Sequence, residues 1–328
     1  MNPGDAPTKT CACTGIRWCA GCRDPRIRRR HRMDDPMPLP GPLSTRPADP
    51  AAIPNPRKAV HDFDLDLQCA PSCPEFQGVR VYLDFLSPDQ ADRLLREVEE
   101  APFVPAQSGK WKQHYGPKVN FNKQKISAGQ FRGLPSYARR IESCLRERVE
   151  RDHAGHPAEL RALRSALESF ETTDAFVLRY SEQHASNLDF HRDDTFAYGE
   201  VILDLSLESD SVLTFLARQS PDSPPSQGCF VRVPLPSRSL AIVHGRARYA
   251  WDHAILAYDI VGRRTSITLR TLNKTLHLSD AGRRILDIAR RAEPLDKVED
   301  RDHRESGVAI RKGSRRSPMR SAILPGRE

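Results

Sequence analysis

Six short stretches in the second half of the chain alternate between apolar and polar residues with a period of two. They begin at about residue 174 and read AFVLRYS, EVILDLSL, SVLTFLA, GCFVRVPL, SLAIVH and RRTSITLR. Side chains on a β-strand point alternately to opposite faces, and the Gly, Pro, Ser and Asp residues between the stretches are typical of turns. So many short strands with turn signals predict a β-sandwich or barrel.

Helices are predicted before and after these strands in the sequence. Ser87 and Gln90 form a capping box, with Pro88 between them at the first helical position, which predicts a helix over 87–101. Apolar residues at helical spacing predict further helices over 137–149, 157–170 and 280–292. The expected fold class is therefore mostly β with flanking helices (α+β).

The charge is distributed unevenly along the chain. The net charge is +8, but residues 1–60 carry +6 and residues 300–328 carry +4, which leaves −2 for the rest. We expect 1–60 and 294–328 to be disordered basic tails, 61–78 to be a linker and 79–293 to be the folded domain. Without a membrane-length apolar run or a signal peptide, we expect a cytoplasmic or nuclear protein with reduced thiols.

The segment DFHRDD (189–194) carries the first candidate metal ligands. His191 and Asp193 are two residues apart, so on extended backbone they project to the same side, with Cα atoms about 6.6 Å apart. An imidazole and a carboxylate at that spacing can reach one cation. Two histidines with one carboxylate are typical of non-haem Fe(II) oxygenases. Taken alone, His-x-Asp is a weak signal that also occurs by chance.

A third ligand must come from elsewhere in the chain. His253, in YAWDHAIL, is the best candidate because it precedes Arg264 by eleven residues, enough for a turn and a return into the next strand. His244 is the competitor, but it adjoins Gly245 at a strand end and is better placed in a turn.

The strand RRTSITLR (263–270) has a polar face that includes Arg264, Ser266 and Arg270. If this face points to water, the arginines are merely solvated; if it points inward, they need anionic partners. 2-Oxoglutarate is such a partner. Arg264 and Ser266 would hold its C5 carboxylate, and Arg270 would lie nearer the metal, beside the C1 carboxylate or Asp193. Because the candidate metal ligands point to the same chemistry, we favour the inward orientation.

Four stretches, SGKWKQHYGPKVNFNKQKI, HRDD, WDHAI and RRTSITLR, resemble the AlkB family of Fe(II)/2-oxoglutarate dioxygenases. Together with the cysteine-rich start, they are most similar to the subgroup of the fourth animal AlkB homologue. The resemblance covers about 79–275 and implies a double-stranded β-helix (jelly-roll) with N-terminal helices and a lid. It also implies catalytic residues: the iron ligands would be His191, Asp193 and His253, and the co-substrate residues would be Tyr180, Arg264 and Arg270.

Two positions depart from the pattern of the family. Leu178 stands two residues before Tyr180, where Asn is usual, so one hydrogen bond to 2-oxoglutarate would be missing. Arg192 stands between the two presumed iron ligands, where a neutral residue is commoner. It could contact an acidic substrate or simply be solvated.

Basic and aromatic residues are interleaved over 107–125. This mixture suits base stacking and phosphate contact, but it suits a protein surface, or a hairpin with its lysines in water, equally well. The family has this stretch over the mouth of the active site, so we predict a substrate lid here. The predicted lid residues are Lys110, Trp111, Tyr115, Lys118 and Phe121.

Four of the eight cysteines lie in the first 22 residues, with the spacing C-x-C-x5-C-x2-C. They are Cys11, Cys13, Cys19 and Cys22. Four thiolates so close together suit a small tetrahedral Zn²⁺ site, and the alternative is four reduced thiols in a disordered tail. Of the others, Cys69 and Cys73 look incidental, and Cys144 is assigned to a helix core.

These features together predict oxidative N-demethylation with Fe(II), 2-oxoglutarate and O₂. Members of the subgroup that the chain resembles are associated with monomethyl-lysine on actin and with N6-methyladenine in DNA. We favour a methylated, actin-like protein substrate because the middle of the chain has a net charge of −2. A demethylase of N6-methyladenine or alkylated bases is the alternative, and its binding to nucleic acid would depend steeply on salt.

A non-catalytic binding module, recruiting partners through zinc and the tails, is a third hypothesis. No membrane partner is expected.

Overall fold

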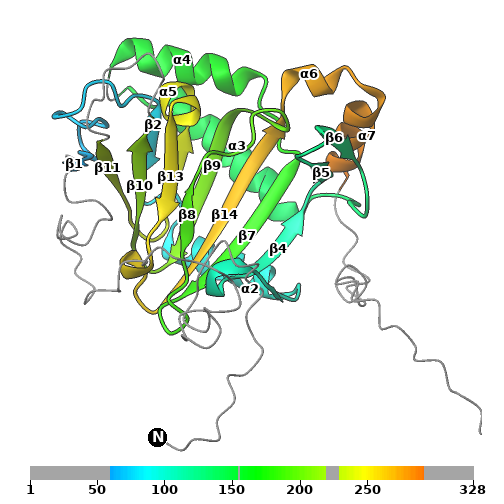
Figure 1. The fold of residues 1–328 in the computed structure, drawn as a ribbon, viewed down its shortest axis with the longest axis horizontal. Helices are drawn as coiled ribbons and strands as arrows, with labels where there is room; N and C mark the ends of the chain where they lie inside the picture. The colour runs from blue at the N-terminus through cyan, green and yellow to red at the C-terminus, as the bar shows by residue number, and fades with distance from the viewer. Residues whose placement is uncertain (1–59, 154–155, 219–228, 292–328) are drawn as a thin grey trace, which may run out of the picture. The chain divides into compact units, whose positions relative to one another are not determined.

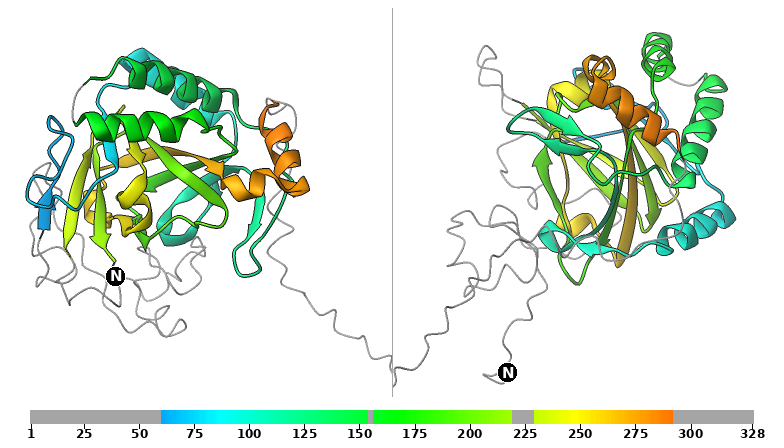
Figure 2. Two further views of the ribbon diagram at one scale, coloured as in Figure 1. Left: turned by 90° about the horizontal axis from the view of Figure 1, so that it is seen from above. Right: turned by 90° about the vertical axis from the view of Figure 1, so that its right-hand side faces the viewer.

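The computed structural model of the chain describes residues 60–153, 156–218 and 229–291. Within them, two β-sheets face each other, and helices cover the outer face of the larger sheet (Figure 1). Both views in Figure 2 show the helices α2 (Pro88–Glu99), α3 (Ser136–Glu150) and α4 (Pro157–Glu168) on one side of the strands. This arrangement confirms the predicted double-stranded β-helix with flanking helices.

The larger sheet has seven strands in the order β2-β12-β9-β14-β7-β4-β3, and all neighbours are antiparallel. The strands are β2 (Val79–Tyr82), β12 (Leu240–Val243), β9 (Tyr198–Glu208), β14 (Arg263–Leu272), β7 (Asp174–Ser181), β4 (Trp111–Tyr115) and β3 (Val104–Pro105). The central strand of this sheet, β14, pairs with its neighbour β7 without interruption from Arg263 to Arg270.

The smaller sheet has five strands in the order β1-β11-β10-β13-β8. They are β1 (Val60–Asp62), β11 (Phe230–Leu235), β10 (Ser211–Ala217), β13 (Trp251–Ile255) and β8 (Leu188–His191). Only the β1–β11 pair of this sheet is parallel. A separate hairpin is formed by β5 (Lys118–Asn120) and β6 (Lys125–Ser127), and β6 contacts the C-terminal helix α7 (Asp280–Ala289).

The helices begin where the sequence predicts. Ser87 caps α2 and exchanges hydrogen bonds with Gln90 in a complete capping box. Pro157 is the first residue of α4, and Ser279 caps α7. The short helical segments are α5 (Gly245–Tyr249), α6 (Lys274–His277), η3 (Gln107–Gly109) and η4 (Ala257–Asp259). No described helix is long and apolar enough to cross a membrane.

The strand β14 separates two hydrophobic cores. Ile267 and Leu269 lie in the outer core, between the larger sheet and the helices. The opposite face of β14 points into the inner core between the two sheets, where Arg264 and Ser266 are almost completely buried. The polar face therefore points inward, so its arginines need partners inside the protein.

The structure corrects the prediction that residues 61–78 form a linker. This segment contains most of β1, and it buries Phe63, Cys73 and Phe76 in the inner core. A three-residue strand followed by tight turns has no periodicity that a sequence pattern could reveal. Two further expectations, the basic tails and the cluster Cys11, Cys13, Cys19 and Cys22, lie outside the described residues. Cys144 is exposed on α3, not part of a helix core.

Candidate active site

Two neighbouring strands of the smaller sheet bring the predicted metal ligands together. His191 ends β8 and stands directly opposite His253 on β13, with ring centroids 4.4 Å apart. Asp193 follows two residues after β8, and its Oδ2 lies 3.5 Å from His253 Nε2. One ligand atom from each of the three residues lies within 4.8 Å of the others. The competitor His244 lies elsewhere, as the N-cap residue of α5.

The surroundings of both imidazoles suit a metal ligand. His191 Nδ1 lies 2.8 Å from the carbonyl oxygen of Asp189. Because a carbonyl only accepts, Nδ1 carries the proton of this hydrogen bond, and Nε2 is the nitrogen that this contact leaves for a metal. Burial, and then the neighbouring His191, lower the pKa of His253 to about 3, so its ring is neutral at physiological pH.

Asp193 is kept ionised although it is buried. Burial by itself raises the pKa of a carboxyl group, but Arg270, the strongest opposing influence, lowers the pKa of Asp193 well below its usual range. Arg270 Nη2 lies 2.8 Å from Asp193 Oδ1. Arg248 adds a second restraint, because its Nη1 donates to the backbone oxygen of Asp193 at 2.7 Å. The carboxylate is therefore fixed in charge and position.

Arg270 also contacts a second buried acid, Asp174, which the sequence analysis did not identify. Arg270 Nη1 lies 3.0 Å from Asp174 Oδ1, and the two residues are register partners on β14 and β7. Asp174 Oδ2 lies 2.7 Å from His114 Nε2 on β4. The alternation of β7 could have revealed it, because Asp174 is on the same strand face as Tyr180.

The predicted co-substrate residues form a second group, farther along β14. Arg264 is fully buried, and its guanidinium carbon lies 5.3 Å from the centroid of the Tyr180 ring. Arg264 Nη2 donates to Asp204 Oδ2 at 2.9 Å and to Ser206 Oγ at 2.7 Å. Burial raises the pKa of Tyr180, which therefore remains a hydrogen-bond donor. Asp204 and Ser206, both on β9, were missed by the sequence analysis.

The donor groups fit the two cofactors that the sequence predicts. Two imidazoles and an ionised carboxylate, with no cysteine among them, are a suitable ligand set for Fe(II). Among the described residues, the buried Nε of Arg264 has no hydrogen-bond partner. Such a donor is costly to bury unless an acceptor reaches it, and a carboxylate of 2-oxoglutarate is an acceptor of the right kind.

The residues of the predicted lid do not form one element. Trp111 and Tyr115 belong to β4, which pairs with β7 inside the larger sheet. Lys118 and Phe121 belong to the β5–β6 hairpin, where Phe121 is half exposed. Only the hairpin and the exposed indole of Trp111 therefore have the solvent contact that a lid needs.

Lys110 corrects the lid prediction in a different way. Its side chain is only 4% exposed, its Nζ donates to the backbone oxygen of Asn187, and it lies 5.9 Å from the centroid of the Tyr180 ring. Lysine is almost always at the surface, so no residue pattern predicts its burial here. It adds a second positive charge to the region of Tyr180 and Arg264.

The two departures from the family pattern have different surroundings. Leu178 is buried in the inner core, on the same face of β7 as Tyr180. Arg192 turns to the surface and donates from Nη1 to the backbone oxygen of Tyr249 at 2.9 Å.

Known proteins resemble this chain over most of its length. A family model described as the 2OG-Fe(II) oxygenase superfamily matches residues 78–270. The alpha-ketoglutarate-dependent dioxygenase alkB homolog 4 of Homo sapiens is 31% identical over 289 residues, which covers 81% of this chain and 87% of that protein. The Mus musculus protein of the same name is 30% identical over 292 residues, with coverages of 80% and 87%. A Caenorhabditis elegans protein named DNA N6-methyl adenine demethylase is 28% identical over 276 residues, with coverages of 81% and 88%.

Proposed function

This chain belongs to the AlkB family of 2OG-Fe(II) oxygenases, and we propose that it removes N-methyl groups from lysine in an actin-like protein. The observation that carries the oxidative part is the convergence of His191, Asp193 and His253, whose ligand atoms lie within 4.8 Å of one another. Fe(II) bound there, with 2-oxoglutarate and O₂, would supply the oxidation of the methyl group, which leaves as formaldehyde.

The polypeptide contributes a fixed ligand set. His191 presents Nε2 because Asp189 binds the proton on Nδ1, and His253 is neutral because it is buried. Asp193 cannot turn away from the site while Arg270 holds its side chain and Arg248 its backbone. Three protein ligands leave the remaining coordination positions open for the co-substrate and O₂.

The co-substrate is assigned to the space beside Tyr180, Arg264 and Ser266. Their hydroxyl and guanidinium donors suit the C5 carboxylate of 2-oxoglutarate, and Lys110 adds positive charge nearby. Arg270 lies beside Asp193, which is one of the two positions expected for it. It is already paired with Asp193 and Asp174, so we assign it to holding the iron-binding carboxylate.

The choice of a protein substrate rests on charge. The chain outside its basic ends carries −2, and burial removes Lys110 from the basic surface that a nucleic acid would use. The second candidate is demethylation of N6-methyladenine in DNA, supported by the name of the Caenorhabditis elegans relative and by the exposed Trp111 and Phe121, which suit base stacking.

Two expectations from the sequence alone are carried forward as part of the proposal. Zn²⁺ at Cys11, Cys13, Cys19 and Cys22 would form a small N-terminal element outside the described residues. A cytoplasmic or nuclear location fits the reduced thiols that such a site needs.

The test is a measurement of formaldehyde and succinate with two parallel substrate panels. The full chain is incubated with Fe(II), 2-oxoglutarate and either methyl-lysine proteins or methylated oligonucleotides, at low and high salt. Formaldehyde from the protein panel alone supports the proposal, and formaldehyde from the oligonucleotides alone replaces it with the second candidate. His191→Ala should abolish succinate formation, whereas His184→Ala, at an exposed histidine outside the site, should not. No succinate with any substrate would favour a binding module.

A further inference from the structure

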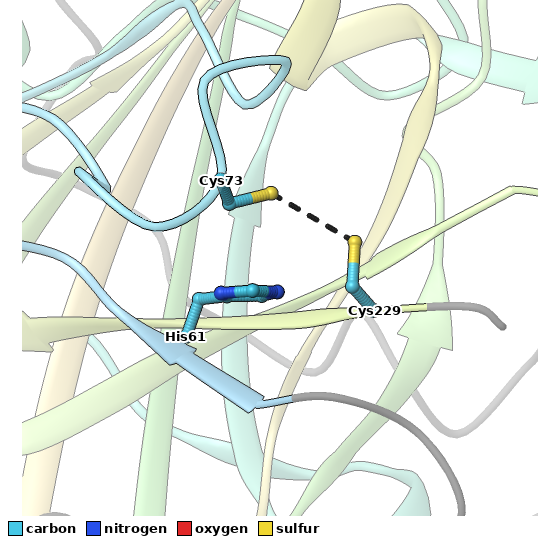
Figure 3. A group of neighbouring side chains, drawn as sticks. All are labelled: His61, Cys73 and Cys229. Atoms are coloured by element: carbon cyan, nitrogen blue, oxygen red, sulfur yellow. Dashed lines mark hydrogen bonds between the residues drawn. The ribbon is translucent and has the colours of Figure 1, made fainter. Parts of the chain in front are cut away.

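A second cluster of metal-binding side chains lies outside the candidate active site. It consists of His61 on β1, Cys73 in the turns between β1 and β2, and Cys229 immediately before β11 (Figure 3). One ligand atom from each lies within 4.8 Å of the others. Neither the family resemblance nor the proposed reaction uses any of these residues.

The fold brings these three residues together from distant parts of the sequence. The parallel pairing of β1 with β11 puts His61 opposite Val231, two residues beyond Cys229. Residues two apart on a strand share a face, so Cys229 and Val231 both face the inner core, where they are buried. Cys73 is fixed by two successive turns, in which its N–H donates to Ala70 and its carbonyl accepts from Phe76. Figure 3 shows both sulfurs on the same side of the His61 ring.

The distance between the two sulfurs matches a tetrahedral metal ion. Cys73 Sγ lies 3.8 Å from Cys229 Sγ. Two Zn–S bonds of about 2.3 Å at the tetrahedral angle separate their sulfurs by about 3.8 Å. A disulfide would require about 2.05 Å. The backbone therefore holds the two side chains at the spacing of zinc ligands.

His61 has a polar partner that can orient its ring. His61 Nδ1 shares a 2.9 Å hydrogen bond with Ser72 Oγ. Metal-binding histidines commonly use one ring nitrogen for such an outer contact and the other for the metal. Nε2 of His61 is the nitrogen that this contact leaves for a cation.

The weak acidity of the Cys73 thiol argues against a redox switch at this place. Burial, and then the neighbouring Cys229, raise the pKa of the Cys73 thiol to about 12. A protonated thiol is a poor nucleophile, so thiol–disulfide exchange would be slow. A divalent cation deprotonates thiols that coordinate it, because its charge outweighs the cost of the buried thiolate.

We propose that His61, Cys73 and Cys229 bind one Zn²⁺ ion, with a water molecule as the fourth ligand. Binding releases the two thiol protons to solvent. The charge of Zn²⁺ is then balanced by the two thiolates, and the imidazole and the water molecule are neutral ligands. The ion would join the segment that follows β1 to the start of β11, two parts of the chain more than 150 residues apart.

The cluster has a direct packing link to the candidate active site. Phe76, three residues after Cys73, packs against Phe215 and Trp251, with each pair of ring centroids 4.9 Å apart. Phe215 in turn lies 5.9 Å from the ring of His253. Zinc would therefore hold the aromatic side chains against which the β13 histidine packs.

The test removes every other thiol that could bind metal. The full chain is prepared with the six other cysteines, Cys11, Cys13, Cys19, Cys22, Cys69 and Cys144, replaced by serine. Co²⁺ is then titrated under reducing conditions, and the thiolate-to-cobalt absorption in the near ultraviolet is recorded. Because the candidate iron site contains no cysteine, one equivalent of Co²⁺ with this absorption reports Cys73 and Cys229 alone. This background needs no change at the proposed site.

Single substitutions then assign the ligands. Cys229→Ser in this background should remove at least half of the absorption, and His61→Ala should weaken Co²⁺ binding at least tenfold. His184→Ala, at an exposed histidine, is the matched control and should change neither. Native mass spectrometry of the otherwise unmodified chain should show one zinc fewer after Cys229→Ala, which repeats the test without the serine background.

Two results would overturn the proposal. The first is a six-serine chain that has its normal circular dichroism spectrum but no thiolate-to-cobalt absorption. The second is recovery of a disulfide-linked peptide containing Cys73 and Cys229 from protein kept under reducing conditions. Both outcomes are independent of demethylase activity, so they do not depend on the proposed function.

Discussion

Arg270 and Asp174 stand opposite each other on β14 and β7, and their side chains form a 3.0 Å ion pair inside the protein. The other side of the same guanidinium group holds Asp193. Asp174 is therefore a positioning residue for the candidate iron ligand, because it fixes the arginine that fixes Asp193. Its full burial shields this chain of contacts from water.

Replacing Asp174 by Asn should weaken metal binding without removing a ligand. Arg270 would lose one of its two anionic partners and would hold Asp193 less firmly. Loss of such outer contacts typically costs about 10- to 100-fold in metal affinity or activity. Mn²⁺ affinity measured by calorimetry checks this, with Asp287→Asn, in an exposed ion pair, as the control. Equal affinities in the two variants would contradict the positioning role.

Arg264 and its neighbour Arg263 provide a matched pair for testing the co-substrate site. Arg264 is fully buried, whereas the Arg263 side chain is 58% exposed and pairs with Glu208. Arg264→Gln should raise the KM for 2-oxoglutarate at least tenfold, since truncating one partner of a buried charge pair costs about 2–5 kcal/mol. Arg263→Gln should leave this KM within twofold. A KM that rises equally in both variants would place the co-substrate elsewhere.

Leu178→Asn should restore a hydrogen bond that the family pattern contains. If residue 178 faces the co-substrate, one added bond of about 1 kcal/mol lowers the KM for 2-oxoglutarate roughly fivefold. Val177→Asn is the control. Val177 is next to Leu178 in the sequence, but its side chain is buried in the outer core, so this substitution should only destabilise the protein. An unchanged KM in Leu178→Asn, with intact folding, would show that the co-substrate does not reach this position.

The ion pair between Glu171 and Arg290 should make the free energy of unfolding decrease as the pH becomes acidic. Burial raises the pKa of Glu171, but the opposing hydrogen bond and charge of Arg290 lower it below its usual value. A lowered folded-state pKa stabilises the protein above the unfolded pKa of about 4.3, and this contribution is lost as pH falls through the folded value.

The matching measurement is the free energy of unfolding at pH 7 and below pH 4 for Glu171→Gln. The Arg290 side chain is 60% exposed, so solvent screening limits the effect to about 1 kcal/mol or less. The variant should lose that amount at pH 7 and little at low pH. Glu147→Gln, at an exposed pair with 3.8 Å separation, should show no such difference.

Local patterns were sufficient for much of the fold. The capping box of Ser87 and the alternation over β14 are written in consecutive residues, and both predictions agree with the structure. The same alternation predicted that Arg264 and Ser266 share a face. A two-residue spacing likewise predicted that His191 and Asp193 could share a site, as they do.

Features that depend on partners far along the chain were missed. Asp174 becomes important only through Arg270, 96 residues away. Burial of Lys110 depends on the carbonyl of Asn187, and nothing near residue 110 in the sequence indicates it. Cys73 looked incidental because Cys229, its neighbour in the fold, is 156 residues away. Such contacts arise from the tertiary pairing of strands, which residue spacing does not encode.

The parallel pairing of β1 with β11 has a practical consequence for the boundaries of this domain. A truncated chain starting at Val79, the limit that residue patterns suggest, would lack β1 and leave the hydrogen-bonding groups of β11 uncovered. Bare sheet edges recruit strands from other molecules, so the shortened protein should aggregate where the longer one stays dispersed. Expression trials should therefore keep the residues from Val60 onward.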